Sequence, residues 1–116
     1  YMQPHTQYDV TMEETHHVYK KDAPSGTAIS IAEGILQNLG RKTSWTANIE
    51  KTSPDVLYID HKRIHNEPGI HEVQYRSAVD QITINHTAFS RDGFATGAVV
   101  AAEFIFGKKG IFDMQA

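Results

Sequence analysis

Three basic side chains lie close together near residue 20 of this 116-residue sequence. His16, His17 and Lys20 place two imidazoles and one ammonium within a short stretch of chain. Histidine is the side chain best matched to proton transfer near neutral pH, and a lysine can pair with a carboxylate or deliver a proton. The cluster therefore suits an anionic substrate that is protonated during a reaction.

A helix start follows this basic cluster directly. Pro24 fixes one backbone angle, and Ser25 is a suitable N-cap for a helix that begins near Ala28. Free N–H groups near Gly26 and Thr27 would carry the positive end of the helix dipole. Gly26 has no side chain to keep a carboxylate away, and the Thr27 hydroxyl adds a donor. Together with the cluster, this start predicts an anion-binding site.

Each part of this group also has a purely structural interpretation. Adjacent histidines on a strand point to opposite faces, so at least one of His16 and His17 could be an ordinary packed residue. The cap at Ser25 by itself says only that a helix begins. Only the combination favours binding and proton transfer over packing.

The composition limits the kind of partner. A formal net charge of −3 gives no general attraction to nucleic acid or to an anionic membrane, so an anion must be captured by a local basic cluster. The absence of cysteine excludes disulfides and thiolate metal sites, and we expect a cytoplasmic setting. Because the sequence opens at Tyr1 and not at a methionine, we expect it to be an excised domain.

Two elements in the first half must position these residues. Apolar and polar residues alternate over 8–13, which predicts a half-buried strand that ends near His16 and His17. Helical spacing over 28–39 predicts an amphipathic helix, with Gly40 as its left-handed terminating residue.

The second half predicts more sheet and a second helix. We expect a strand at 56–60, followed by a polar, basic loop through His61, Lys62, Arg63 and His65. Val73, Tyr75, Ile82 and Ile84 indicate an antiparallel hairpin that turns near 78–80. Residues 94–106 are almost wholly apolar and predict a buried helix that Gly107 ends. The predicted fold is one α+β domain over 1–116, with a mostly antiparallel or mixed sheet packed against two main helices.

Residues 14–28 resemble a long motif of the dihydrodipicolinate reductase family, E-x-H-H-x-x-K-x-D-A-P-S-G-T-A. Three further elements extend the resemblance over nearly the whole chain: Arg63, Gly69 and His71 (R…G-x-H), Ser90-Arg91 with Phe94-Ala95 and Gly97-Ala98 (S-R-x-x-F-A-x-G-A), and Gly110 to Met114 (G-[LI]-[YF]-D-M). One position departs from the family, because His65 stands where a glycine is usual, and Pro68 stiffens the same loop.

The resemblance implies an enzyme of lysine and diaminopimelate biosynthesis that uses NADH or NADPH to reduce a cyclic dicarboxylated imine to tetrahydrodipicolinate. By the same resemblance, His16 is a proton donor or acceptor and Lys20 a second proton donor. The implied substrate contacts are His17, Gly26 and Thr27.

The family's fold has an N-terminal Rossmann domain followed by a substrate domain whose sheets associate into a homotetramer. This chain resembles the second domain alone, since no residues resemble a G-x-G-x-x-G phosphate loop, and alone we expect it to be inactive. Arg91 and Phe94 are candidate cofactor contacts, although core packing explains Phe94 equally well.

Two other functions stay open at this point. Seven histidines, with a His61 and His65 pair and a His71-Glu72 dipeptide, contain real metal-ligand types, although we expect no metal. A purely structural oligomerisation domain would share the tetramer but would bind no small dicarboxylate.

Overall fold

The first strand lies at the centre of the sheet and carries both core and site residues. The computed structural model describes residues 1–113, and in it strand β1 runs over Asp9–His16. Val10 and Met12 are buried on one face, and the same alternation continues to Glu14 and His16, which are also buried. The predicted half-buried strand is therefore confirmed, including its end at His16.

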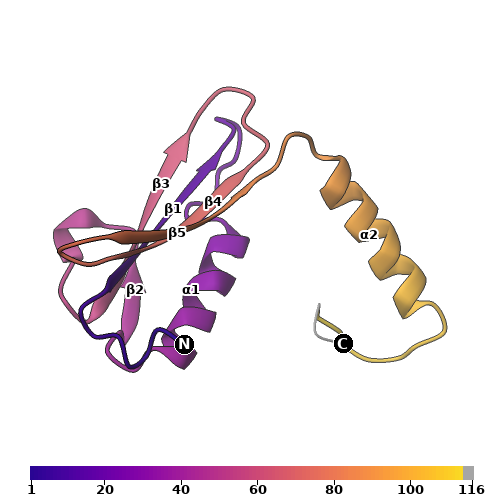
Figure 1. Cartoon of the computed structure of the whole chain (residues 1–116). Helices are drawn as coiled ribbons and strands as arrows, with labels where there is room; N and C mark the ends of the chain where they lie inside the picture. Colours follow the sequence, from indigo (N-terminus) through magenta and orange to yellow (C-terminus); the bar gives the residue numbers. More distant parts are fainter. Residues whose placement is uncertain (114–116) are drawn as a thin grey trace.

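Five strands form one mixed sheet in the order β2-β3-β1-β4-β5 (Figure 1). The other strands are β2 (Ser44–Thr46), β3 (Val56–Arg63), β4 (Ile70–Arg76) and β5 (Gln81–Thr87). Strand β3 pairs in parallel with both β1 and β2, whereas β4 pairs antiparallel with β1 and with β5. The α+β fold with a mixed sheet and the β4–β5 hairpin are as predicted.

Helix α1 (Gly26–Asn38) covers one face of this sheet (Figure 1). The Ser25 side chain caps it, because its Oγ accepts a hydrogen bond from the Ala28 N–H at 3.1 Å. The buried apolar core lies between helix and sheet and consists of Val10, Met12, Ala28, Ala32, Leu39, Leu57 and Ile59. The prediction that Gly40 is left-handed was wrong, since φ is not positive there; the Gly40 N–H instead donates to Gln3 Oε1 at 2.9 Å.

Strand β3 is longer than predicted, and this corrects the expected loop. His61, Lys62 and Arg63 continue the strand, and Arg63 lies in register with His16 of β1. The apolar run that signals a strand stops at Ile59, but pairing with β1 extends the regular backbone by four residues. This extension places Arg63 beside the predicted site.

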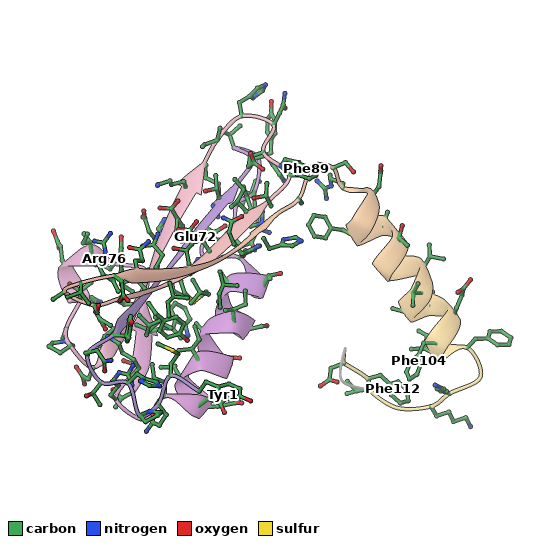
Figure 2. All side chains as sticks on the ribbon, viewed as in Figure 1. Tyr1, Glu72, Arg76, Phe89, Phe104 and Phe112 are labelled. Atoms are coloured by element: carbon green, nitrogen blue, oxygen red, sulfur yellow. The ribbon has the colours of Figure 1, made fainter. Side chains whose placement is uncertain are left out.

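Helix α2 (Asp92–Ile105) forms where predicted and is followed by Gly107 with φ +74°, but its predicted burial was wrong. None of its residues is buried, and the helix lies apart from the sheet (Figure 1). Figure 2 shows Phe89 at the connection, with Phe104 and Phe112 near the far end of the helix. A helix this apolar needs a cover, and residues 1–113 do not provide one. The sequence therefore identified the helix correctly, while the predicted burial is not found within these residues.

A short 3-10 helix, η1 (Ile49–Lys51), connects β2 to β3. In the described range, neither helix is long and apolar enough to cross a bilayer. The last family motif runs to Met114, which lies outside the described residues.

Candidate functional site

The fold brings most of the predicted site residues to one pocket of about 210 Å³. The pocket lies where β1 ends and α1 begins, with β4, β5 and the start of α2 on its other sides. Nine of the described residues line it: His16, His17, Lys20, Thr27, Pro68, His71, His86, Arg91 and Phe94.

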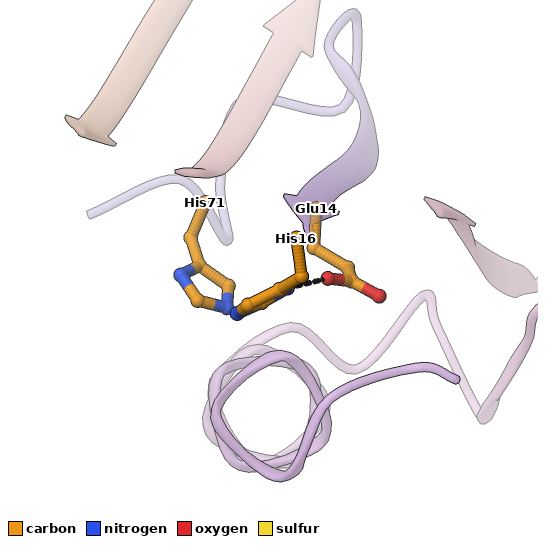
Figure 3. Close-up of side chains that lie close together, drawn as sticks. All are labelled: Glu14, His16 and His71. Atoms are coloured by element: carbon orange, nitrogen blue, oxygen red, sulfur yellow. Dashed lines mark hydrogen bonds and ion pairs between the residues drawn. The ribbon is translucent and has the colours of Figure 1, made fainter. Parts of the chain in front are cut away.

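A buried carboxylate, that of Glu14, holds the imidazole ring of His16 through Nδ1. Its Nδ1 forms a hydrogen bond with Glu14 Oε2, shown dashed in Figure 3, and the Glu14 side chain is fully buried. Both residues come from the same face of β1, two positions apart, so the strand itself sets their spacing. The other ring nitrogen, Nε2, lies against Gly69, where an added Cβ would come within 3.1 Å of it.

Arg63 neutralises the same carboxylate from the other side. Its Nη1 lies 2.9 Å from Glu14 Oε1, and its remaining N–H groups donate to the main-chain carbonyls of Lys20 at 3.3 Å and Asp22 at 2.7 Å. A buried charge requires a partner, and this one has two hydrogen-bonded partners. Sequence reasoning placed Arg63 in a polar, basic loop and in a family motif, and missed its contact with Glu14.

His71 lies beside His16 and ties the pocket to the helix start. The two imidazole rings meet edge to face with centroids 5.0 Å apart (Figure 3), and His71 Nε2 is hydrogen-bonded to Ser25 Oγ at 3.0 Å. Burial lowers the pKa of His71 below its usual value, and the nearby His16 lowers it further. A neutral His71 is thus favoured in the folded protein.

Lys20 lies in the loop between β1 and α1, half-buried at the edge of the pocket. Its ammonium lies 3.0 Å from Asp22 Oδ2, and this contact lowers the pKa of the exposed Asp22 carboxyl. An exposed pair of this kind is weak, so a substrate carboxylate could replace Asp22 as the partner of Lys20.

The start of α1 offers free donors at the pocket. The N–H groups of Gly26 and Thr27 donate to no acceptor within residues 1–113, since the Ser25 side chain satisfies only the next N–H, that of Ala28. Thr27 lines the pocket, whereas Gly26 is exposed beside it and open space surrounds the place of a Cβ. The helix start can therefore receive an anion.

His17 also lines the pocket. This matters for the structural interpretation in which one of the two adjacent histidines is only a packed residue. Because β1 ends at His16, the alternation of faces along a strand does not extend to His17. His16 is buried and His17 is half-buried, and both line the pocket.

His86 is a lining residue that sequence reasoning missed. It lies in β5 directly opposite His71 of β4. Ile82 and Ile84 predict the hairpin, and His86 is the next residue on the same face of β5. The alternation of faces along a strand could therefore have predicted the position of His86. Arg91 and Phe94, the candidate cofactor contacts, lie at the start of α2 and line the same pocket.

The described lining of the pocket is made of basic and neutral side chains, although the chain is acidic overall. Six lining side chains are histidine, lysine or arginine, and none of the lining residues within 1–113 is acidic. Such a pocket attracts a small compound with more than one negative charge, and its histidines and lysine can exchange protons with that compound.

The metal hypothesis takes a different form in the structure. His61 and His65 are exposed and contribute to no ligand group in the described range; the side chains that come within ligand distance of one another are Glu14, His16 and His71. Arg63 lies against Glu14 and Lys20 lines the same pocket, so their positive charges disfavour a cation there.

Comparisons with known proteins identify related sequences and structures. A family model described as dihydrodipicolinate reductase, C-terminus, matches residues 1–116. The 4-hydroxy-tetrahydrodipicolinate reductase of Christiangramia forsetii is 47% identical over 114 residues, which cover 98% of this chain and 47% of that protein. The reductase of the same name from Desulfotalea psychrophila is 37% identical over 114 residues, covering 92% of this chain and 42% of that protein.

A solved structure has the same fold. It is a dipicolinate-bound dihydrodipicolinate reductase from Paenisporosarcina sp. TG-14, with a TM-score of 0.63 and 20% identity, covering 92% of this chain and 43% of that one. The chain thus spans about half the length of the curated relatives it matches. On the family match, the identities and the shared fold together, this chain belongs to the dihydrodipicolinate reductase family and corresponds to its C-terminal part.

Proposed function

We propose that this chain is the substrate-binding half of a 4-hydroxy-tetrahydrodipicolinate reductase. The whole protein would reduce a cyclic dicarboxylated imine to tetrahydrodipicolinate, a step of lysine and diaminopimelate biosynthesis. The observation that carries the proposal is the pocket with six basic side chains and no acidic one among the described lining residues, inside a chain of net charge −3. The membership of the family supports the same reaction.

In this proposal the two carboxylates of the substrate take different partners. The start of α1, with the free N–H groups of Gly26 and Thr27, receives one carboxylate together with Lys20. His17 contacts the substrate from the end of β1. His16 or Lys20 supplies the proton, since both line the pocket and both can transfer one.

The residues present fit one side of a nicotinamide cofactor. Arg91 offers a cation and Phe94 an aromatic ring at the pocket, which suits a flat ring system that carries phosphates. We propose that NADH or NADPH is bound mainly by an N-terminal Rossmann domain outside this chain, with Arg91 and Phe94 as contacts. When bound, the cofactor supplies the hydride. The chain's own residues hold the substrate and provide the proton.

We further propose that the intact protein is a homotetramer assembled through its sheets. Strand β5 is exposed along its whole length, including Ile82 and Ile84, and an exposed strand edge with apolar side chains favours association. A cytoplasmic location stays a prediction from the sequence.

Titration of this chain with pyridine-2,6-dicarboxylate tests the proposal. We expect saturable binding by calorimetry, with NMR shift changes for the Gly26 and Thr27 amides. Pyridine-2-carboxylate, which lacks one carboxylate, is the matched ligand control and should bind more weakly. Equal binding of the two compounds would contradict a site that recognises two carboxylates, and binding of neither would favour a purely structural oligomerisation domain.

A further inference from the structure

Glu14 is a buried acidic side chain that the proposed reaction does not use. It lies on β1 between the core residue Met12 and the site residue His16, and its side chain is fully shielded from solvent. A carboxylate at such a position is costly unless it is paired and hydrogen-bonded. Its two oxygens have different partners, His16 Nδ1 on one side and Arg63 Nη1 on the other.

The contact between Arg63 and Glu14 determines which atom donates the hydrogen in the bond between Glu14 and His16. A guanidinium can only donate hydrogen bonds, so the Glu14 oxygen it contacts at 2.9 Å acts as an acceptor, and the positive charge favours the ionised carboxylate. An ionised carboxylate has no proton to give to the imidazole. The His16 Nδ1 must therefore carry the hydrogen, which leaves Nε2 as the atom that can gain or lose a proton.

The surroundings of Nε2 fit this assignment. Gly69 lies against it with φ +155°, and an added Cβ there would come within 3.1 Å of Nε2 and 3.3 Å of Cδ2. The ring of His71 also meets His16 edge to face, with the ring centroids 5.0 Å apart. The ring is thus fixed in one orientation at the wall of the pocket.

Arg63 also connects His16 with the loop that carries Lys20. Its Nε donates to the Lys20 carbonyl at 3.3 Å and its Nη2 to the Asp22 carbonyl at 2.7 Å. The Arg63 side chain therefore contacts the carboxylate that bonds His16. It also holds the main-chain carbonyls of Lys20 and Asp22, whose side chains form an ion pair.

We propose that Glu14 and Arg63 are positioning residues that fix His16 in its Nδ1-protonated tautomer, with Nε2 available to the substrate, and that Arg63 sets the Lys20 loop to match. This inference rests on the proposed function, in which His16 exchanges a proton with the substrate. Neither residue touches the substrate.

The first test reads the tautomer in the unchanged chain. Nitrogen-15 NMR at about pH 9, where histidine is ordinarily neutral, should show a protonated Nδ1 and an unprotonated Nε2 in His16. A His16 ring protonated at Nε2 under these conditions overturns the proposal, and this test requires no variant to fold.

The second test is Glu14→Gln in the intact reductase. Because Arg63 requires an acceptor, the glutamine oxygen should face Arg63 and its NH2 group should face His16, which forces the imidazole into the Nε2-protonated tautomer. We expect kcat to fall by at least about tenfold, as when a carboxylate that orients a histidine is neutralised, with little change in affinity for pyridine-2,6-dicarboxylate. Unchanged kcat overturns the proposal.

Glu13→Gln is the matched control. Glu13 is the preceding residue of β1, points to the other face of the sheet and is also ion-paired, with Lys62 Nζ at 2.6 Å. This variant should change neither the tautomer nor kcat. His16→Asn distinguishes failure of the proposed function from failure of the positioning role. If His16→Asn retains activity, the proposed role of His16 in proton transfer is wrong. If His16→Asn loses activity and Glu14→Gln does not, only the positioning role of Glu14 is wrong.

Discussion

At the scale of single residues, Lys20 is the only lysine among the residues of 1–113 that line the pocket. Its present partner, Asp22, is a mostly exposed carboxylate in the same loop. Pairs of this kind contribute little to stability, so the ammonium can exchange Asp22 for a substrate carboxylate at small cost. Lys20 is therefore a residue whose loss should affect binding and turnover far more than folding.

We predict that Lys20→Ala in the intact enzyme abolishes most turnover and leaves the fold unchanged. The loss of a charge-assisted hydrogen bond to a carboxylate costs roughly 1.5–3 kcal/mol in binding, before any lost proton transfer is counted. Steady-state kinetics and circular dichroism measure the two effects. Lys21→Ala is the matched control, because Lys21 is exposed and does not line the pocket. Near-normal activity of Lys20→Ala would remove this residue from the catalytic set.

His71 makes the free energy of unfolding depend on pH. Burial, and then the neighbouring His16, lower the pKa of His71 below its ordinary value of 6.5, so the folded state holds the ring neutral while the unfolded state binds the proton more readily. The free energy of unfolding should therefore lose the His71 contribution as the pH falls below 6.5 and retain it above. Glu14, His86 and Lys20 also act on this ring.

The measurement is chemical denaturation between pH 5 and pH 8, compared for the unchanged chain and His71→Asn. We expect the variant to show a smaller loss of stability toward acid, because it lacks the group that takes up the proton on unfolding. Equal slopes for the two proteins would contradict this account of His71.

At the scale of elements, β1 and α1 form the frame of the site. The same face of β1 carries core residues in its first half and Glu14 and His16 in its second half. Ser25 then connects the cap of α1 to β4, because its hydroxyl bonds both the Ala28 N–H and His71 Nε2. The pocket is thus built at the point where helix and sheet are joined.

We predict that Ser25→Ala lowers the free energy of unfolding by about 1–2 kcal/mol. The loss of an N-cap side chain costs about 1 kcal/mol, and the buried His71 loses a hydrogen-bond partner as well. Ser30→Ala, an exposed substitution within α1, is the control and should change stability by less than about 0.5 kcal/mol. Denaturant titration of both variants checks this, and equal stabilities would mean that the cap contributes nothing measurable.

At the scale of the whole molecule, apolar side chains of the sheet and of α2 remain exposed to solvent. The residues of α2 remain unburied, with Phe94, Val99 and Val100 about half exposed or more, and β5 forms an open edge. Surfaces of this kind are typical of contacts with another domain or subunit.

We predict that the isolated chain is a homotetramer that binds no nicotinamide cofactor at ordinary concentrations. Closed symmetry would cover the open strand edges, and no glycine-rich turn that could hold a pyrophosphate occurs in the sequence. Light scattering with a parallel NADPH titration measures both. A monomer that persists at high concentration would refute the assembly, and micromolar NADPH binding would mean that the cofactor site lies within this chain.

The sequence alone determined what depends on local interactions. The alternation in β1, the helical spacing of α1 and the cap at Ser25 were predictable, because periodicity and capping involve residues only a few positions apart. The family motif likewise identified His16, Lys20 and Thr27, which the fold brings to one pocket.

Only the tertiary structure decided the features that depend on residues far apart in the sequence. Pairing with β1 turned an expected loop into the end of β3 and placed Arg63 against Glu14, and pairing with β4 brought His86 into the pocket. Gly40 donates its N–H to Gln3, 37 positions away, and residues 1–113 leave α2 uncovered. Local propensity selects an element, but strand pairing and the burial available around it fix where the element ends and what its side chains meet.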